Sequence, residues 1–103
     1  MAVSAEYLTK LRRAVRRAPD PMVDAEITDL VEECRKDLQT LGVLEAKVND
    51  EADGLILGAV RCFVRWKFGI ASTDADPNRE DYMQLRDELR RRREYCISQT
   101  PSP

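Results

Sequence analysis

A stripe of four carboxylates is the set of side chains in this chain best suited by type and spacing to chemistry. Glu26, Asp29, Glu33 and Asp37 follow one another three or four residues apart, which places them on one side of a helix. General acid–base catalysis would also need a nucleophile, a metal-ligand set or a phosphate-binding loop, and none accompanies them. This carboxylate stripe therefore indicates either a contact with the basic helix of a neighbouring subunit or a solvated face with local pairs such as Glu33–Lys36.

The cysteines offer no metal chemistry. Cys34, Cys62 and Cys96 are odd in number and widely spaced, the chain has no Cys-x-x-Cys pair, and it has no histidine. The sequence therefore predicts no zinc site and no other cofactor. Each cysteine lies on or beside an apolar helical face, which favours a role as a small buried hydrophobe. Unpaired thiols of this kind fit a reducing cytosol.

Four consecutive arginines form the first of two basic groups. Arg90, Arg91, Arg92 and Arg93 would surround a helix rather than share one face. We expect them to contact acidic groups of a partner or the DNA backbone. The alternative is a solvated helix end, where positive charge also suits the helix dipole.

The second basic group belongs to the first predicted helix. Its residues that are candidates to contact a partner or DNA are Lys10, Arg13, Arg16 and Arg17. They could bind phosphates, but an ordinary polar face opposite Leu8 is the favoured interpretation. Net charge is −2 for 103 residues, yet residues 18–60 alone carry three basic and eleven acidic groups. Such segregation favours assembly between unlike surfaces over general polyanion binding.

The elements that must position these groups are helices. Apolar residues recur with helical periodicity at about residues 4–18, 22–41, 50–68 and 77–96. We predict an all-α fold, a compact bundle of four helices around the apolar third one. One helical domain is expected over 1–97, followed by a disordered tail at 98–103. The first ten residues lack the apolar run of a signal peptide.

The predicted ends of these helices rest on capping residues. Ser4 is expected to cap the first helix, Asn49 or Asp50 the third, and Asp76 followed by Pro77 to begin the fourth. The Pro19-Asp20-Pro21 run is expected to end the first helix, because proline cannot continue it. Gly42 is expected to end the second in a left-handed conformation, with Val43 as the apolar contact.

The third helix is apolar around most of its circumference. Its apolar positions span roughly 240° of a helical wheel, wider than the stripe of a surface helix. The remaining arc is a line that we call the glycine–arginine line, formed by Gly54, Gly58, Arg61 and Arg65. Two glycines four residues apart let another backbone approach, from within the subunit or from its neighbour. Trp66 is interpreted as core or as an interface anchor, and the segment is too short and too charged to span a membrane.

Several short motifs, in order, resemble a known family. They are Glu33-Cys34-Arg35-Lys36-Asp37-Leu38 with Leu41-Gly42-Val43, then DGLILGAV over 53–60 and VRWKFG over 64–69, then Tyr82, Leu85 and Leu89. Over roughly residues 5–95 the chain resembles the small phage head–tail connector family, also called head-completion or DNA-packaging adaptor proteins of long-tailed phages.

The resemblance implies a structural virion protein without catalytic activity. Such proteins form a homo-oligomeric ring beneath the portal, extend the DNA channel and dock the next neck or tail protein. The implied partners are other copies of the chain, the portal, a downstream neck or tail component, and DNA that passes without sequence readout. The implied location is the virion neck, after assembly in the cytoplasm of the bacterial host. The two basic groups exceed what such a role needs, which leaves open the faces that meet portal and DNA.

A small helical DNA-binding protein of the helix-turn-helix type is the alternative, because helices of this length with basic ends permit it. Against it, the third helix is too apolar to read a groove.

Overall fold

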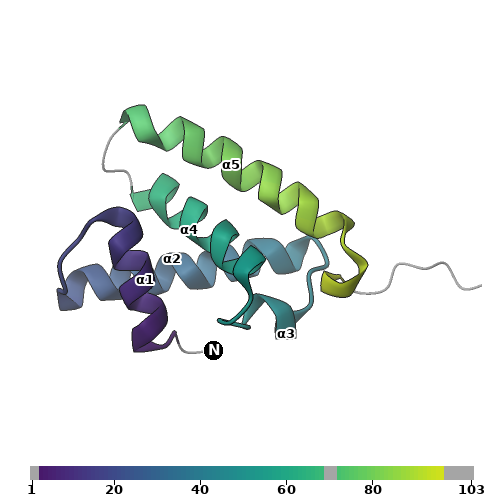
Figure 1. Cartoon of the computed structure of the whole chain (residues 1–103), viewed down its shortest axis with the longest axis horizontal. Coiled ribbons are helices and arrows are strands. Elements are labelled where there is room, and N and C mark those ends of the chain that lie inside the picture. Colours follow the sequence, from purple (N-terminus) through teal and green to yellow (C-terminus); the bar gives the residue numbers. More distant parts are fainter. Residues whose placement is uncertain (1–2, 69–71, 97–103) are drawn as a thin grey trace, which may run out of the picture.

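The computed structural model describes residues 3–68 and 72–96, without the side chains of residues 72–76. Its elements are α1 (Ala5–Val15), α2 (Pro21–Thr40), α3 (Glu45–Val48), α4 (Gly54–Phe68), α5 (Ser72–Arg91) and the short 3-10 helix η1 (Arg93–Tyr95) (Figure 1). The all-α class is confirmed, since helices and their connections account for this part of the chain. The tail predicted to be disordered, residues 98–103, lies outside the described residues.

Helix α4 packs against α1, α2 and α5. In Figure 1 it lies in front of α2, with α1 on one side and α5 along the other. Its buried residues are Ile56, Ala59, Val60, Phe63 and Val64. Because these residues recur every three or four positions, they line one side of the helix. The opposite side of α4 faces the viewer in Figure 1.

Helix α1 begins as predicted and ends three residues early. The hydroxyl of Ser4 accepts a hydrogen bond from the amide of Tyr7, which caps the first turn. At the other end Arg16 adopts a left-handed conformation with φ of 57°. The amides of Arg16 and Arg17 then donate to the carbonyls of Arg13 and Arg12. The predicted end at residue 18 is wrong, because this turn closes the helix before the prolines can.

Helix α2 ends by the same type of turn, built here on glycine. Gly42 has φ of 97°, its amide donates to Gln39, and the amide of Val43 donates to Leu38. Val43 is buried against the core, as the sequence predicts for the apolar contact of this cap. At its start, Asp20 accepts a hydrogen bond from the amide of Met22. Pro21 is therefore the first helical residue, one position before the predicted start.

Replacing Gly42 with alanine should lower the free energy of unfolding by about 1 kcal/mol, because a Cβ disfavours the left-handed conformation. Urea unfolding would measure this difference. Gly54→Ala is the matched control, since nothing lies within 4 Å of a Cβ built there. That residue is in a helix, so alanine should be neutral or stabilising. Equal destabilisation by both changes would contradict the assignment of Gly42.

The start of α4 differs from the prediction. Residues 45–48 form the separate helix α3, and α4 begins only at Gly54. Asp53 caps α4, accepting hydrogen bonds from the amides of Leu55 at 2.9 Å and Ile56 at 3.0 Å. Asn49 and Asp50 are therefore not its caps. Capping residues stand at 49, 50 and 53, and helical periodicity does not choose among them.

The boundaries predicted for the last helix are also wrong. Helix α5 begins at Ser72, and Pro77 lies inside it. A proline in the early turns removes a backbone donor, and packing of the later turns against α4 offsets this loss. At the other end α5 stops at Arg91, and η1 carries the buried Tyr95 back against α3 and the start of α4. The amide of Leu44 donates to the carbonyl of Tyr95 at 2.7 Å.

Candidate protein-interaction surfaces

The glycine–arginine line lies on the uncovered side of α4. Gly54, Arg61 and Arg65 are exposed, and Gly58 is half-buried. A Cβ at Gly58 would lie 3.8 Å from Cδ1 of Leu85 in α5, which is ordinary contact. Neither glycine is therefore needed for a close approach within the subunit. The arginines form no ion pair with the side chains that the structure describes.

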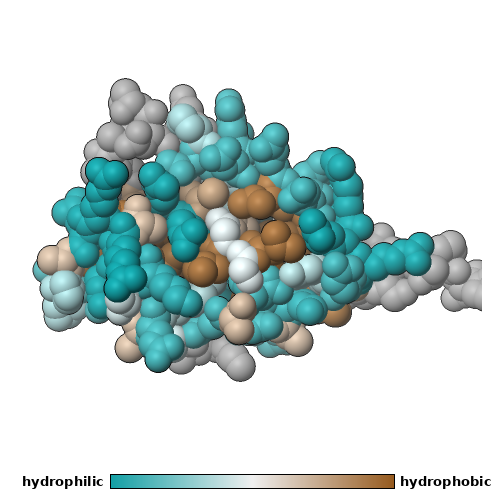
Figure 2. All heavy atoms as spheres, in the orientation of Figure 1, coloured by the Kyte–Doolittle hydropathy of each residue, from teal (hydrophilic) through white to brown (hydrophobic). Residues whose placement is uncertain are grey.

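Apolar surface surrounds this line. Figure 2 shows hydrophobic side chains gathered over α4, with hydrophilic ones around them. Leu55, Leu57 and Cys62 of α4 are only partly buried. At about 100° per residue, Leu55 and Cys62 flank the line on one side and Leu57 on the other. The exposed face of α4 thus combines small residues, apolar edges and two unpaired positive charges.

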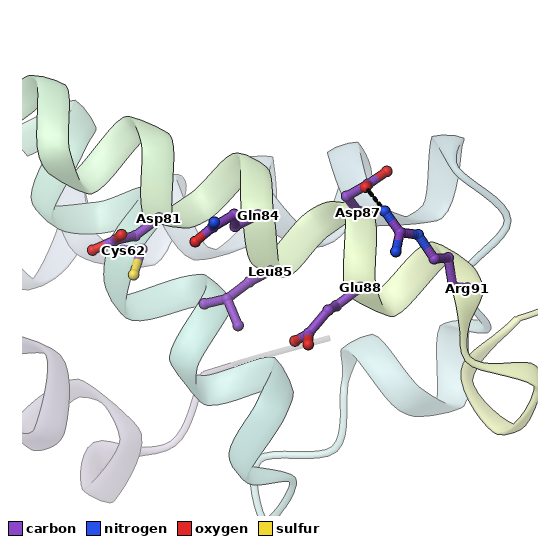
Figure 3. A pocket seen from close by; sticks show the side chains of 7 residues that line it. All are labelled: Cys62, Asp81, Gln84, Leu85, Asp87, Glu88 and Arg91. Atoms are coloured by element: carbon purple, nitrogen blue, oxygen red, sulfur yellow. Dashed lines mark hydrogen bonds and ion pairs between the residues drawn. The ribbon is translucent and has the colours of Figure 1, made fainter.

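A groove of about 590 Å³ runs beside this face, between α4 and α5. Its lining residues are Cys62, Asp81, Gln84, Leu85, Asp87, Glu88 and Arg91. Figure 3 shows Leu85 and Glu88 directed toward α4, whereas Asp87 turns away to meet Arg91. Burial, followed by the charge of Asp81, raises the pKa of the Cys62 thiol. The thiol therefore stays protonated at neutral pH, which makes it a poor nucleophile.

The carboxylate stripe divides into two parts in the structure. Glu26, Asp29 and Glu33 are exposed on α2 and form no ion pair within the described part of the chain. The local pair between Glu33 and Lys36 is accordingly absent there. Asp37 differs, because one oxygen accepts hydrogen bonds from the Tyr82 hydroxyl at 2.6 Å and from Nε of Arg86 at 2.9 Å. Asp37 thus joins α2 to α5 inside the subunit.

This polar contact extends to a buried thiol. Sγ of Cys34 lies 3.8 Å from the Tyr82 hydroxyl. Burial raises the pKa of Cys34 to about 12 and also raises the pKa of Tyr82. Both groups are therefore neutral at physiological pH and serve packing and hydrogen bonding. Sequence reasoning grouped Asp37 with the other three carboxylates and missed Tyr82 and Arg86 as its partners, since no local pattern connects residues 45 or more positions apart.

The arginine run at the end of α5 is partly neutralised by its neighbours. Asp87 accepts from Arg90 at 2.6 Å and also pairs with Arg91. The hydrogen bond from Arg91 contributes most to holding the pKa of the Asp87 carboxyl below its usual value. Arg92 lies 3.9 Å from Glu94. Arg93, in η1, is exposed and has no ion pair among the described side chains.

The basic group of α1 lies at the surface. Lys10, Arg13, Arg16 and Arg17 are all exposed. Arg17 lies over the ring of Phe68, with its Cζ 5.6 Å from the ring centroid. Within α1, Arg12 bridges to another helix, because it pairs with Asp24 of α2 at 2.7 Å. The two basic groups do not form one continuous surface, because α1 and the end of α5 lie on opposite sides of the molecule in Figure 1.

Trp66 has a place in the core as well as at the surface. Its half-buried ring packs edge-on against Phe63, with centroids 5.7 Å apart, and tilted against Tyr82 at 6.2 Å. Nζ of Lys67 lies 4.3 Å from the ring centroid, and Arg79 approaches it at 5.8 Å. These two cations cover part of the Trp66 ring that the core leaves exposed.

The described residues offer candidate interaction surfaces. Among them, no group of three or more histidine, cysteine, aspartate or glutamate residues is placed to hold a metal ion. None of their helices is long and apolar enough to cross a membrane. Comparison with known proteins gives no further guide, because no family model, curated protein or solved structure matches this chain.

Proposed function

We propose that this chain is a head–tail connector protomer that assembles with copies of itself into a ring beneath a phage portal. The observation that carries the proposal is the presence of unpaired opposite charges on different exposed helix faces. Glu26, Asp29 and Glu33 lie on α2, whereas Arg61 and Arg65 lie on α4. Unlike surfaces on one subunit suit head-to-tail contacts, which generate rings when the rotation closes.

In this proposal the mechanism is geometric. The ring extends the DNA channel at the virion neck and presents a surface to the next neck or tail component. Positive side chains along a channel attract the phosphate backbone without reading sequence, because backbone contacts carry no base information. The exposed Arg92 and Arg93, which follow α5, supply a basic surface for portal, DNA or the next neck protein. No chemical step is required.

A helix-turn-helix DNA-binding protein is less well supported. Such a protein places a polar recognition helix in the major groove. Here α4 buries five residues in the core, and its exposed line holds two glycines and two arginines. Sequence-selective binding of duplex DNA by a dimer at moderate salt would favour this alternative over the connector.

Native mass spectrometry and negative-stain imaging, with and without purified portal complexes, would test the connector proposal. We expect a discrete oligomer, either free or added to the portal at one vertex. A protein that is strictly monomeric and also fails to add to portal complexes would refute it.

A further inference from the structure

We propose that the glycine–arginine line of α4 binds the outer face of α2 of a second copy, with the two helices aligned in parallel. This contact deepens the proposed function, on which it rests for its partner, by naming the surfaces that join one subunit to the next. It would make Met22, Glu26, Asp29 and Glu33 of one copy the partners of Gly54, Gly58, Arg61 and Arg65 of the other.

The two surfaces share one spacing. On α2, an exposed methionine is followed at four, seven and eleven residues by the acidic side chains Glu26, Asp29 and Glu33. On α4, Gly54 is followed at the same intervals by Gly58, Arg61 and Arg65. In a helix this spacing gives a nearly straight line about 16 Å long, at 1.5 Å per residue. Each line can therefore face the other along its whole length.

The order of residue types selects the parallel alignment. Met22 is 82% exposed, an unusual state for a large apolar side chain, and it would meet Gly54, where nothing lies within 4 Å of a Cβ. Farther along, Asp29 would meet Arg61 and Glu33 would meet Arg65. An antiparallel alignment would instead place Met22 against Arg65 and carboxylates against the glycines. The parallel arrangement gives both arginines a carboxylate partner, whereas the antiparallel one pairs only Arg61, with Glu26. It also covers the apolar edges seen in Figure 2.

The placement of the two lines permits contact between copies and not within one. Helix α2 turns its buried residues, Ile27, Val31 and Leu38 among them, toward the core that α4 shares. Its acidic side chains therefore point away from α4. A contact between two different surfaces leaves one of each free on every dimer, so a third copy can add in the same way.

Charge reversal tests this contact. The variant Arg61→Glu/Arg65→Glu and the variant Asp29→Lys/Glu33→Lys should each associate with themselves on the order of tenfold more weakly than the unmodified chain. An equimolar mixture of the two should recover association, because each then offers the surface that the other lacks. Sedimentation velocity of the full chain at low salt, over a series of concentrations, would measure all three. Added salt should weaken the native contact.

Two further variants separate the contact from general effects. Lys10→Glu/Arg13→Glu changes the net charge by the same amount on exposed α1 and should leave association unchanged. Gly54→Leu fills space that is open in the subunit, so it should abolish association while the helical circular dichroism and the unfolding midpoint are kept.

Each outcome has a distinct meaning. An unmodified chain that remains monomeric, or reversed variants that associate as well as it does, would overturn the contact. If that chain still added to portal complexes, the connector function would stand without this interface. Recovery in the mixture together with open filaments in negative stain would support the contact and refute the closed ring. Recovery together with closed rings would support both.

Discussion

Replacing Phe63 with alanine should lower the free energy of unfolding by about 3–5 kcal/mol, the largest single effect that we expect for this chain. Phe63 is 3% exposed and is one of the α4 residues that pack against α5. Its ring centroid lies 5.0 Å from that of Tyr82 and 5.7 Å from that of Trp66. Truncation removes apolar area and leaves a cavity between two aromatic rings that are themselves held by other contacts.

Urea unfolding followed by tryptophan fluorescence would measure this loss, because Trp66 is the only tryptophan and touches Phe63 directly. Phe63→Leu is the matched control, since it keeps most of the volume and should cost about 1 kcal/mol. Trp66→Ala should cost less than Phe63→Ala, because part of the Trp66 ring already lies in water. If Phe63→Ala and Phe63→Leu were equally stable, the ring would not be part of a packed core.

Replacing Asp53 with alanine should cost about 2 kcal/mol, from the lost helix cap and a lost hydrogen bond to a charged acceptor. One oxygen of Asp53 accepts from the amides of Leu55 and Ile56, and the other accepts from the Tyr95 hydroxyl at 2.7 Å. Asp53 thus joins the start of α4 to Tyr95 in η1. Asp53→Asn should cost less than the alanine variant, because asparagine is an equally good cap.

The contribution of Asp53 depends on pH with a defined sign. Burial opposes ionisation, but the hydrogen bonds from Tyr95 and the two amides outweigh it and lower the pKa of the carboxyl. Its stabilising effect is therefore present above the ordinary aspartate pKa of about 4 and is lost as pH falls through the lower, folded-state pKa. The stability gap between the native chain and Asp53→Asn should shrink over this acidic range. A gap that widened on acidification would contradict the hydrogen-bonded carboxylate.

Tyrosine titration gives a second measure of the same contact. The hydrogen bond to Asp53 raises the pKa of Tyr95 to about 12. In Asp53→Ala one tyrosine should therefore titrate nearer the ordinary value of about 10.

Helical periodicity predicted the elements of this fold better than their ends. The four apolar segments became α1, α2, α4 and α5, because each keeps a buried face over several turns. The caps at Ser4 and Gly42 were predicted, since hydroxyl and glycine residues have strong local preferences at helix ends. The end of α1 was not, because Arg16 takes a left-handed conformation that arginine does not favour by itself.

For the candidate surfaces too, features set by neighbouring residues could be predicted, whereas contacts between residues far apart in the sequence could not. The exposure of the glycine–arginine line could be predicted, because it is the polar arc of one helix. The internal roles of Asp37 and Asp53 could not, since Tyr82 and Tyr95 reach them from more than 40 residues away. Pro77 misled the prediction for α5, because a strong local signal for a helix start was overridden by packing against α4.

The return of the chain through η1 has an entropic consequence for the arginines that precede it. Tyr95 is buried, its hydroxyl is bound by Asp53, its carbonyl is bound by Leu44, and Cys96 forms an isolated bridge with Val43. The backbone that carries Arg90–Arg93 is therefore anchored on both sides. A partner that binds there need immobilise only guanidinium side chains, and it avoids the cost of ordering a frayed helix end.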